Sequence, residues 1–211
     1  MDGNNRWSKK NNISLSKSYD KGVKNLLKIS EYCFFELDIN YVSAFALSSH
    51  NMTRSKKVIQ PIIKLLDIYL DEFIHNHHKY KYNIKFIGKF DIFNNQTIAK
   101  ISKINSQNNY KKNLIIALNY SGSEDILNAS YLLSKNNSKN LTLKSFLSTS
   151  EYPDPDILIR TGGYQRLSDF YLFQISFTEF FFLKTLWPNF SLKSINLIIN
   201  KYLKIERKFG K

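Results

Sequence analysis

The sequence predicts an α/β domain with a mostly parallel sheet and helices on both of its faces. Segments typical of strands alternate with segments typical of helices along the whole chain, as in a parallel sheet connected by crossover helices. Two strand segments, 113–120 (NLIIALNY) and 156–160 (DILIR), are almost continuously apolar, which is expected of strands covered on both faces. A chain of 211 residues is the size of one such domain, so residues 1–211 are interpreted as a single domain.

The individual elements follow from apolar periodicity and from the residues that begin helices. Apolar residues recur at helical spacing in 20–36, and a β-rich run follows at 41–47. A long amphipathic helix is expected at 56–79, with Pro61 in its opening turns, where proline disrupts a helix least. The other expected elements are a strand at 82–88, a helix at 94–104, the strand at 113–120, a helix at 123–135 capped by Ser123, a short helix at 141–147, the strand at 156–160, a helical turn at 168–176 capped by Ser168, a strand at 180–183 and a closing helix at 191–208.

The net charge of +14 suggests an anionic partner such as a phosphate-bearing substrate, a nucleic acid or a membrane surface. The chain is also rich in Lys, Asn and Ile and poor in Arg and Gly, a pattern typical of codon drift in an AT-rich genome, which by itself inflates the lysine content. Arginine therefore indicates more than charge where it persists, because its planar fork binds an anion through two parallel hydrogen bonds. The arginines are Arg6, Arg54, Arg160, Arg166 and Arg207.

Several classes of protein are disfavoured by the composition. No apolar run approaches the roughly 20 residues that span a bilayer, and the first residues contain no secretory signal, so a cytoplasmic protein is expected. The single cysteine, Cys33, allows no internal disulfide and is expected to be a small buried hydrophobe. The lysine-rich segments lack the aromatic spacing of an RNA-recognition motif, so no nucleic-acid partner is expected. His75, His77 and His78 complement a helix end rather than form a metal site.

Polar clusters follow three of the expected strands: SSHNMTR at 48–54, NYSGS at 119–123 and RTGGYQR at 160–166. Ligands of parallel sheets bind at the carboxyl ends of the strands. Arg160 and Arg166 flank the Gly162–Gly163 turn, and two arginine forks can grip a diphosphate that glycines allow the backbone to approach. Ser168 would add a hydroxyl at a helix start. In the alternative interpretation, the glycines form an ordinary turn and the arginines pair with a nearby aspartate.

The first residues, DGNNRW at 2–7, combine a carboxylate, a glycine, two amides and an arginine. They could form a phosphate cradle with Asp2 as a magnesium ligand, or they could be a disordered chain start. Neither a P-loop nor a dinucleotide-binding glycine motif occurs in the chain.

Three segments together, MDGNNRW (1–7), SSHNMTR (48–54) and DILIRTGGYQRLSDFYLFQISFTEFFFLKTLWPNF (156–190), closely resemble the cis-prenyltransferases, the undecaprenyl-diphosphate synthase family. The last segment is the most specific, and the resemblance extends over essentially the whole chain. It implies an enzyme that condenses isopentenyl diphosphate with an allylic diphosphate, such as farnesyl diphosphate, to make a cis-polyprenyl diphosphate of the undecaprenyl type.

The resemblance also implies what such a protein needs. Two diphosphates held side by side require arginine forks, backbone donors and Mg²⁺. The growing chain requires a hydrophobic tunnel, for which the helices at 20–36 and 56–75 offer apolar faces. A homodimer and peripheral membrane contact for product release are further expectations.

The resemblance assigns roles to matching positions. Asp2 would be the essential carboxylate and a magnesium ligand, with Glu179 as the second ligand, and Asn51 occupies the proton-acceptor position. Arg207 and Gly210 would belong to a C-terminal element that reaches a site across the dimer. The substrate-binding residues would be Gly3, Asn4, Asn5, Arg6 and Trp7 for the allylic diphosphate and its first isoprene, Ser48, Ser49, His50, Met52 and Arg54 in the loop beside the reacting carbons, and Arg160, Arg166, Leu167 and Ser168 for isopentenyl diphosphate.

The chain also departs from the family pattern. The family usually has an arginine where Leu15 stands and a histidine where Tyr19 stands, both serving the allylic diphosphate. Losing the arginine fork would cost about 1.5–3 kcal/mol of charge-assisted binding, unless Lys17 or Lys21 compensates. The other departures are Asn5 for Gly, His50 for Glu, Met52 for an aromatic residue, Ser123 for Arg and Tyr164 for Glu.

The family normally has an apolar strand just before the MDGN segment. Its absence, as from a late start codon or a truncated gene, would leave the sheet without a central strand and Asp2 without an anchor. These departures keep open the alternative of a degenerate, non-catalytic subunit that supports a catalytic partner. The presence of both the DGN and the RTGG elements favours catalysis.

Overall fold

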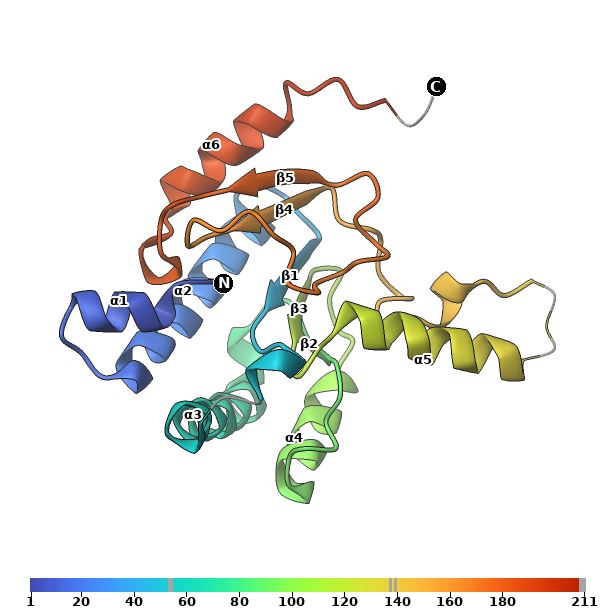
Figure 1. The fold of residues 1–211 in the computed structure, drawn as a ribbon, viewed down its shortest axis with the longest axis horizontal. Helices are drawn as coiled ribbons and strands as arrows, with labels where there is room; N and C mark the ends of the chain where they lie inside the picture. Colours follow the sequence, from blue (N-terminus) through green and yellow to red (C-terminus); the bar gives the residue numbers. More distant parts are fainter. Residues whose placement is uncertain (53–54, 137, 139, 209–211) are drawn as a thin grey trace.

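The computed structural model describes residues 1–52, 55–136, 138 and 140–208, and its strands form two parallel sheets (Figure 1). The larger sheet has the order β1 (Tyr41–Phe45), β3 (Asn113–Ala117), β2 (Asn83–Ile87). The smaller sheet pairs β4 (Ile157–Arg160) with β5 (Glu179–Phe182). All three strand pairings are parallel, so the predicted α/β class is confirmed.

Among the described residues, no strand of one sheet pairs with a strand of the other. Within the described residues, β1 pairs only with β3 and β4 pairs only with β5, so each has one edge without a strand partner. A single cavity is lined by every residue of β1 and of β4. The division between the sheets therefore lies beside this cavity.

The described residues contain six α-helices around the sheets. The helices predicted at 56–79, 94–104, 123–135 and 191–208 begin within one residue of the expected position. The helix predicted at 20–36 begins earlier, at Leu15, and the helix at the chain start was not predicted. Ser14, Asn94, Ser121 and Ser191 each accept a hydrogen bond from a backbone N–H in the first turn of the following helix. The cap of the fifth helix is thus Ser121 and not Ser123, as predicted from the sequence, because Ser121 is the last extended residue before the helix. The helices are α1 (Asn4–Lys10), α2 (Leu15–Phe35), α3 (Lys56–His75), α4 (Asn95–Asn105), α5 (Gly122–Lys135) and α6 (Leu192–Tyr202).

The side chains of the three-stranded sheet alternate between two cores, as the pleat requires. Phe86, Leu114 and Ile116 face the larger core, which α2, α3, α4 and α6 complete. Ile87, Ile115 and Ala117 face the smaller core, which is covered by the segment after β4. In Figure 1, α5 projects from the body of the molecule.

Two sequence predictions about the C-terminal third are wrong. No helix forms at 168–176, because Ser168, Asp169 and Tyr171 have positive φ angles of 53°, 66° and 51°, and such residues cannot continue a right-handed helix. Residues 172–177 form only turns. Ser168 is therefore not a helix cap. The closing helix ends at Tyr202, six residues earlier than predicted. No described helix is long and apolar enough to cross a membrane.

Candidate active site

Asp2 is held at the carboxyl end of β4 by its own main chain. Its N–H donates to the Thr161 hydroxyl oxygen (3.0 Å), and that hydroxyl donates to the Asp2 carbonyl oxygen (3.0 Å). The Trp187 N–H donates to the same carbonyl oxygen at 3.0 Å. The expectation that Asp2 would lack an anchor is therefore wrong, because the loop that follows β4 supplies one.

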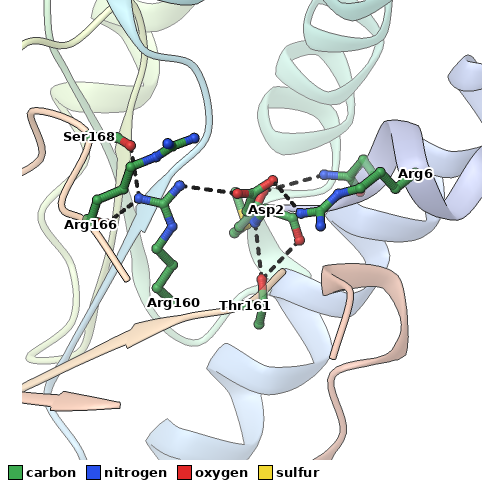
Figure 2. Close-up of polar contacts among 8 residues, drawn as sticks. Asp2, Arg6, Arg160, Thr161, Arg166 and Ser168 are labelled. Carbon is green, nitrogen blue, oxygen red and sulfur yellow. Dashed lines mark hydrogen bonds and ion pairs between the residues drawn. The ribbon is translucent and has the colours of Figure 1, made fainter. Parts of the chain in front are cut away.

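The carboxylate of Asp2 lies between two guanidinium groups (Figure 2). Its Oδ1 is 3.3 Å from Arg6 Nη2, and its Oδ2 is 3.1 Å from Arg160 Nη2. The alternative that Arg160 and Arg166 pair with a nearby aspartate thus holds for Arg160, which pairs with Asp2. One carboxylate between two arginines leaves the group with net positive charge.

Arg160 connects the end of β4 to the loop that follows it. Its Nη1 donates to Ser168 Oγ (2.8 Å) and to the carbonyl oxygen of Arg166. Its Nε is buried and has no hydrogen-bond partner among the described residues. A buried donor without a partner is costly, and this one belongs to a side chain that lines the cavity.

The carboxylate of Asp169 fastens the same loop to the start of α5. It accepts hydrogen bonds from the hydroxyls of Ser121 and Ser123 and from the Ser123 N–H (2.9 Å). Burial alone would raise the pKa of Asp169, but these bonds and the nearby His50 outweigh it, so the pKa lies below its usual value. Ser168 and Asp169 are thereby held in left-handed backbone conformations, which cluster at functional sites.

Gly162 allows the two arginine-bearing segments to approach each other. Its φ angle is +91°, and a Cβ at this position would lie 2.6 Å from Arg6 Nη2 and 3.1 Å from the Asp2 carboxyl carbon. Only glycine meets both conditions without strain. The glycine turn in the sequence therefore brings the N-terminal segment against the end of β4.

The ring of Tyr164 lies among the arginines, a contact that the sequence did not indicate. The guanidinium carbons of Arg166, Arg6 and Arg160 are 4.3, 5.0 and 5.8 Å from the ring centroid. These distances are within the range of cation–π attraction. Thr161 was also missed, although a threonine between Arg160 and the glycine turn was a possible signal.

The loop after β1 reaches the same cavity with only some of its predicted residues. Ser48, His50 and Asn51 line the cavity, whereas Ser49 and Met52 do not. Ser48 accepts a hydrogen bond from the Asn51 N–H (3.2 Å), which begins the short helix η1 (Ser49–Asn51). Met52 instead packs against the larger core. Arg54 and Gly210 lie outside the described residues.

The N-terminal residues divide in the same way. Gly3, Asn4, Asn5 and Arg6 line the cavity, but Trp7 does not. The Trp7 ring is buried, and its Nε1 donates to Asn189 Oδ1 (2.9 Å). Trp7 therefore packs against the short helix η4 (Trp187–Asn189), and its expected contact with the substrate stays a prediction.

Glu179 and Arg207 lie away from Asp2 in this chain. Glu179 is the first residue of β5 and pairs with Ile157 of β4. Ile157 precedes Thr161 by four residues, which corresponds to roughly 13 Å along the strand at about 3.3 Å per residue. No described group of three or more His, Cys, Asp or Glu side chains could hold a metal ion. Arg207 contacts its own chain at Asp156, the Tyr202 hydroxyl and the Phe177 carbonyl oxygen (2.9 Å).

The positions that depart from the family pattern on α2 have different surroundings. Tyr19 lines the cavity, whereas Leu15, Lys17 and Lys21 do not. The Lys21 ammonium lies 4.4 Å from the centroid of the Trp7 ring. Neither Lys17 nor Lys21 therefore places its side chain in the cavity, where it could replace the arginine that the family usually has at position 15.

The cavity behind these groups has a volume of about 1800 Å³. Its walls are mainly apolar side chains of α2, α3, β1 and α6, such as Leu26, Leu66, Phe73 and Ile199. The two helices expected to line a tunnel therefore do line the cavity. An arginine cluster beside an apolar cavity is suited to a ligand with an anionic head and a hydrocarbon tail.

A parallel α/β fold with an arginine-bound carboxylate beside an apolar cavity suits the class of enzymes that act on prenyl diphosphates. A family model described as putative undecaprenyl diphosphate synthase matches residues 1–210. The chain belongs to this family, and the resemblance seen in the sequence is confirmed.

Individual relatives agree with the family. The chain is 34% identical over 223 residues to dehydrodolichyl diphosphate synthase 3 of Arabidopsis thaliana, covering 100% of this chain and 74% of the relative. It is 33% identical over 216 residues to the isoprenyl transferase of Rickettsia typhi, covering 100% and 95%. An enzyme that transfers prenyl groups is therefore supported.

Two solved structures share the fold. Lavandulyl diphosphate synthase from Lavandula x intermedia, in complex with dimethylallyl diphosphate, is similar at a TM-score of 0.91 and 26% identity, over 100% of this chain and 95% of that one. A probable undecaprenyl diphosphate synthase from Campylobacter jejuni is similar at a TM-score of 0.79 and 30% identity, over 91% and 93%. The first of these structures shows a protein of this fold that binds dimethylallyl diphosphate.

Proposed function

We propose that this protein condenses isopentenyl diphosphate with an allylic diphosphate to make a cis-polyprenyl diphosphate. The observation that carries the proposal is the meeting of Asp2, Arg6 and Arg160 at an apolar cavity of about 1800 Å³. A diphosphate head would bind to the arginines, and the hydrocarbon tail would enter the cavity.

The chemistry assigns a task to each part of the site. The carbon–oxygen bond of the allylic diphosphate breaks and releases pyrophosphate, the double bond of isopentenyl diphosphate forms the new carbon–carbon bond, and a proton is then lost. Preorganised arginines stabilise the charge that develops on the departing pyrophosphate. Arg160 has an unpartnered Nε for this purpose. Asn51 lines the same cavity and is proposed to lie beside the carbon that loses the proton.

Magnesium is proposed as the cofactor, with Asp2 as its ligand from this chain. Mg²⁺ commonly binds one or two carboxylates together with substrate phosphates, and Asp2 offers one carboxylate beside the diphosphate-binding arginines. The ion would neutralise charge on the diphosphate when bound. Glu179, at the far end of β5, is not included in this proposed site.

A homodimer is proposed as the functional form. Leu127 and Tyr131, one helical turn apart on α5, are 72% and 59% exposed, and exposed apolar patches are typical of interfaces. Sedimentation velocity tests this: a single species at monomer mass over the micromolar range would reject it. Product release at a membrane surface is also proposed, and binding to lipid vesicles tests it.

The decisive assay combines purified protein, farnesyl diphosphate, labelled isopentenyl diphosphate and Mg²⁺, followed by extraction of the product. Labelled polyprenyl product is expected, whereas its absence would favour the alternative of a non-catalytic subunit. Asp2→Ala should abolish turnover without changing the thermal unfolding temperature beyond a few degrees. Asp91→Ala is the matched control, since Asp91 is exposed and does not line the cavity. Full activity of Asp2→Ala would reject the site.

A further inference from the structure

The three arginines of the site share one aromatic neighbour, Tyr164. Arg6 comes from α1, and Arg160 and Arg166 flank the glycine turn. Their guanidinium carbons lie 5.0, 5.8 and 4.3 Å from the centroid of the Tyr164 ring. Like charges brought together repel each other, and the negative face of an aromatic ring offsets part of this repulsion without adding a negative charge.

The distribution of carboxylates makes this neutral partner significant. Asp2 pairs with Arg6 and Arg160. Among the described residues, no carboxylate lies within ion-pair distance of Arg166, whose guanidinium is the closest of the three to the ring. The ring therefore holds Arg166 in place while its full charge remains available to an anion.

The ring also joins segments that are distant in the sequence. Arg6 lies on α1 and Tyr164 follows the glycine turn, where Gly162 leaves room for the Arg6 guanidinium. The Tyr164 side chain is 44% exposed and lines the cavity. It is thus part of the ligand-binding surface rather than part of the core.

We propose that Tyr164 is a positioning residue that orients Arg6 and Arg166 for diphosphate binding and keeps the site one charge more positive than a carboxylate would. This inference rests on the proposed function. Because the ring bridges the segments proposed for the two substrates, its loss should raise the KM for both. The ring has no expected contact with the reacting carbons, so kcat should change little.

The test measures the binding of inorganic pyrophosphate by calorimetry at several salt concentrations, together with KM and kcat, for three variants. Tyr164→Phe keeps the ring and should bind within about twofold of the wild type. Tyr164→Leu should weaken binding about five- to thirty-fold, as expected for two cation–π contacts, with an unchanged salt dependence. Tyr164→Glu should weaken binding and also flatten its salt dependence, because it removes one positive charge from the site.

Tyr110→Leu is the matched control, since Tyr110 is a tyrosine that is 38% exposed and does not line the cavity. It should leave pyrophosphate binding unchanged. Wild-type affinity in Tyr164→Leu would overturn the inference, and so would a loss in Tyr164→Phe equal to that in Tyr164→Leu, because the hydroxyl would then be responsible. A wild type that makes no prenyl product, but whose pyrophosphate affinity falls in Tyr164→Leu, would overturn the proposed function and support the inference.

Discussion

At the residue scale, the position of the candidate catalytic carboxylate depends on Thr161. This side chain is 1% exposed and makes both of its hydrogen bonds to the main chain of Asp2. A hydroxyl that both accepts from and donates to one residue fixes the direction of that residue's backbone. Asp2 can then present its carboxylate to Arg6 and Arg160.

Thr161→Val keeps the shape of the side chain and removes both hydrogen bonds. We expect the free energy of unfolding to fall by about 1–3 kcal/mol, because the Asp2 N–H and carbonyl group lose a partner, and prenyl transfer to fall with it. Urea unfolding and the product assay measure the two effects. Thr185→Val is the control, since Thr185 is exposed. Equal stability of the two variants would contradict the anchoring role of Thr161.

Arg160→Lys tests whether the planar fork or the charge is required. Arg160 contacts Asp2 through Nη2 and Ser168 through Nη1, and a single lysine ammonium cannot span both. We expect the KM for isopentenyl diphosphate to rise much more than the KM for farnesyl diphosphate. Steady-state kinetics with each substrate varied in turn give the comparison. An equal rise in both would contradict the assignment of Arg160 to isopentenyl diphosphate.

Cys33 offers a separate test of the core. It is 3% exposed, as the sequence predicted, and burial raises the pKa of its thiol to about 11. The reactive species is the thiolate, so we expect labelling by a thiol reagent at pH 8 to be many-fold slower in the native protein than in urea. Similar rates in the two conditions would show that the region around α2 opens readily.

At the element scale, the loop that follows β4 is positioned by α5. Asp169 binds Ser121 and Ser123 at the start of that helix, where a negative charge also complements the helix dipole. The sequence predicted a helical turn capped by Ser168 in this loop. The carboxylate–helix contact instead favours left-handed backbone conformations that no local pattern indicates.

The lowered pKa of Asp169 has a consequence for stability against pH. A carboxyl group whose folded-state pKa is depressed stabilises the fold above its unfolded pKa, about 3.9, and loses that contribution as the pH falls through the folded value. We expect Asp169→Asn to be less stable than the wild type at pH 7 and to show a flatter decline of unfolding free energy below about pH 4. Asp91→Asn serves as the control, and an identical pH profile for Asp169→Asn and wild type would refute the role.

At the scale of the whole molecule, the cavity connects the arginine cluster to the helices. Its volume is about 1800 Å³, and α2 and α3 supply much of its apolar wall. Under the proposed function, the space available to the growing chain limits the length of the product.

Leu66→Trp tests this relation, since Leu66 lines the cavity on α3. The larger ring should fill part of the space, and we expect shorter polyprenyl products at a similar initial rate. Ile68→Trp, on the same helix at a position 56% exposed, is the matched control. Chromatography of the dephosphorylated products gives the length distribution, and an unchanged distribution for Leu66→Trp would contradict the role of the cavity.

How much the sequence could predict depended on whether the signal was local. The helices α2, α3 and α4 and the strands β1 to β4 lie close to their predicted positions, since periodicity and capping act over a few residues. Arg160, which was predicted from a local motif, lines the cavity. Trp7, Ser49 and Met52 were expected at the substrate, but in the structure other faces of the same segments line the cavity.

The sequence by itself determined the order and type of most elements, the buried character of Cys33 and the segments that contain the site. Only the tertiary structure decided that Asp2 is anchored by Thr161, 159 residues away in the sequence. It also decided that Glu179 lies at the end of β5 that is remote from Asp2, and that Tyr164 lies among three arginines. The physical reason is that such contacts depend on strand order, register and the path of a left-handed loop. These follow from the packing of distant segments rather than from the spacing of neighbouring residues.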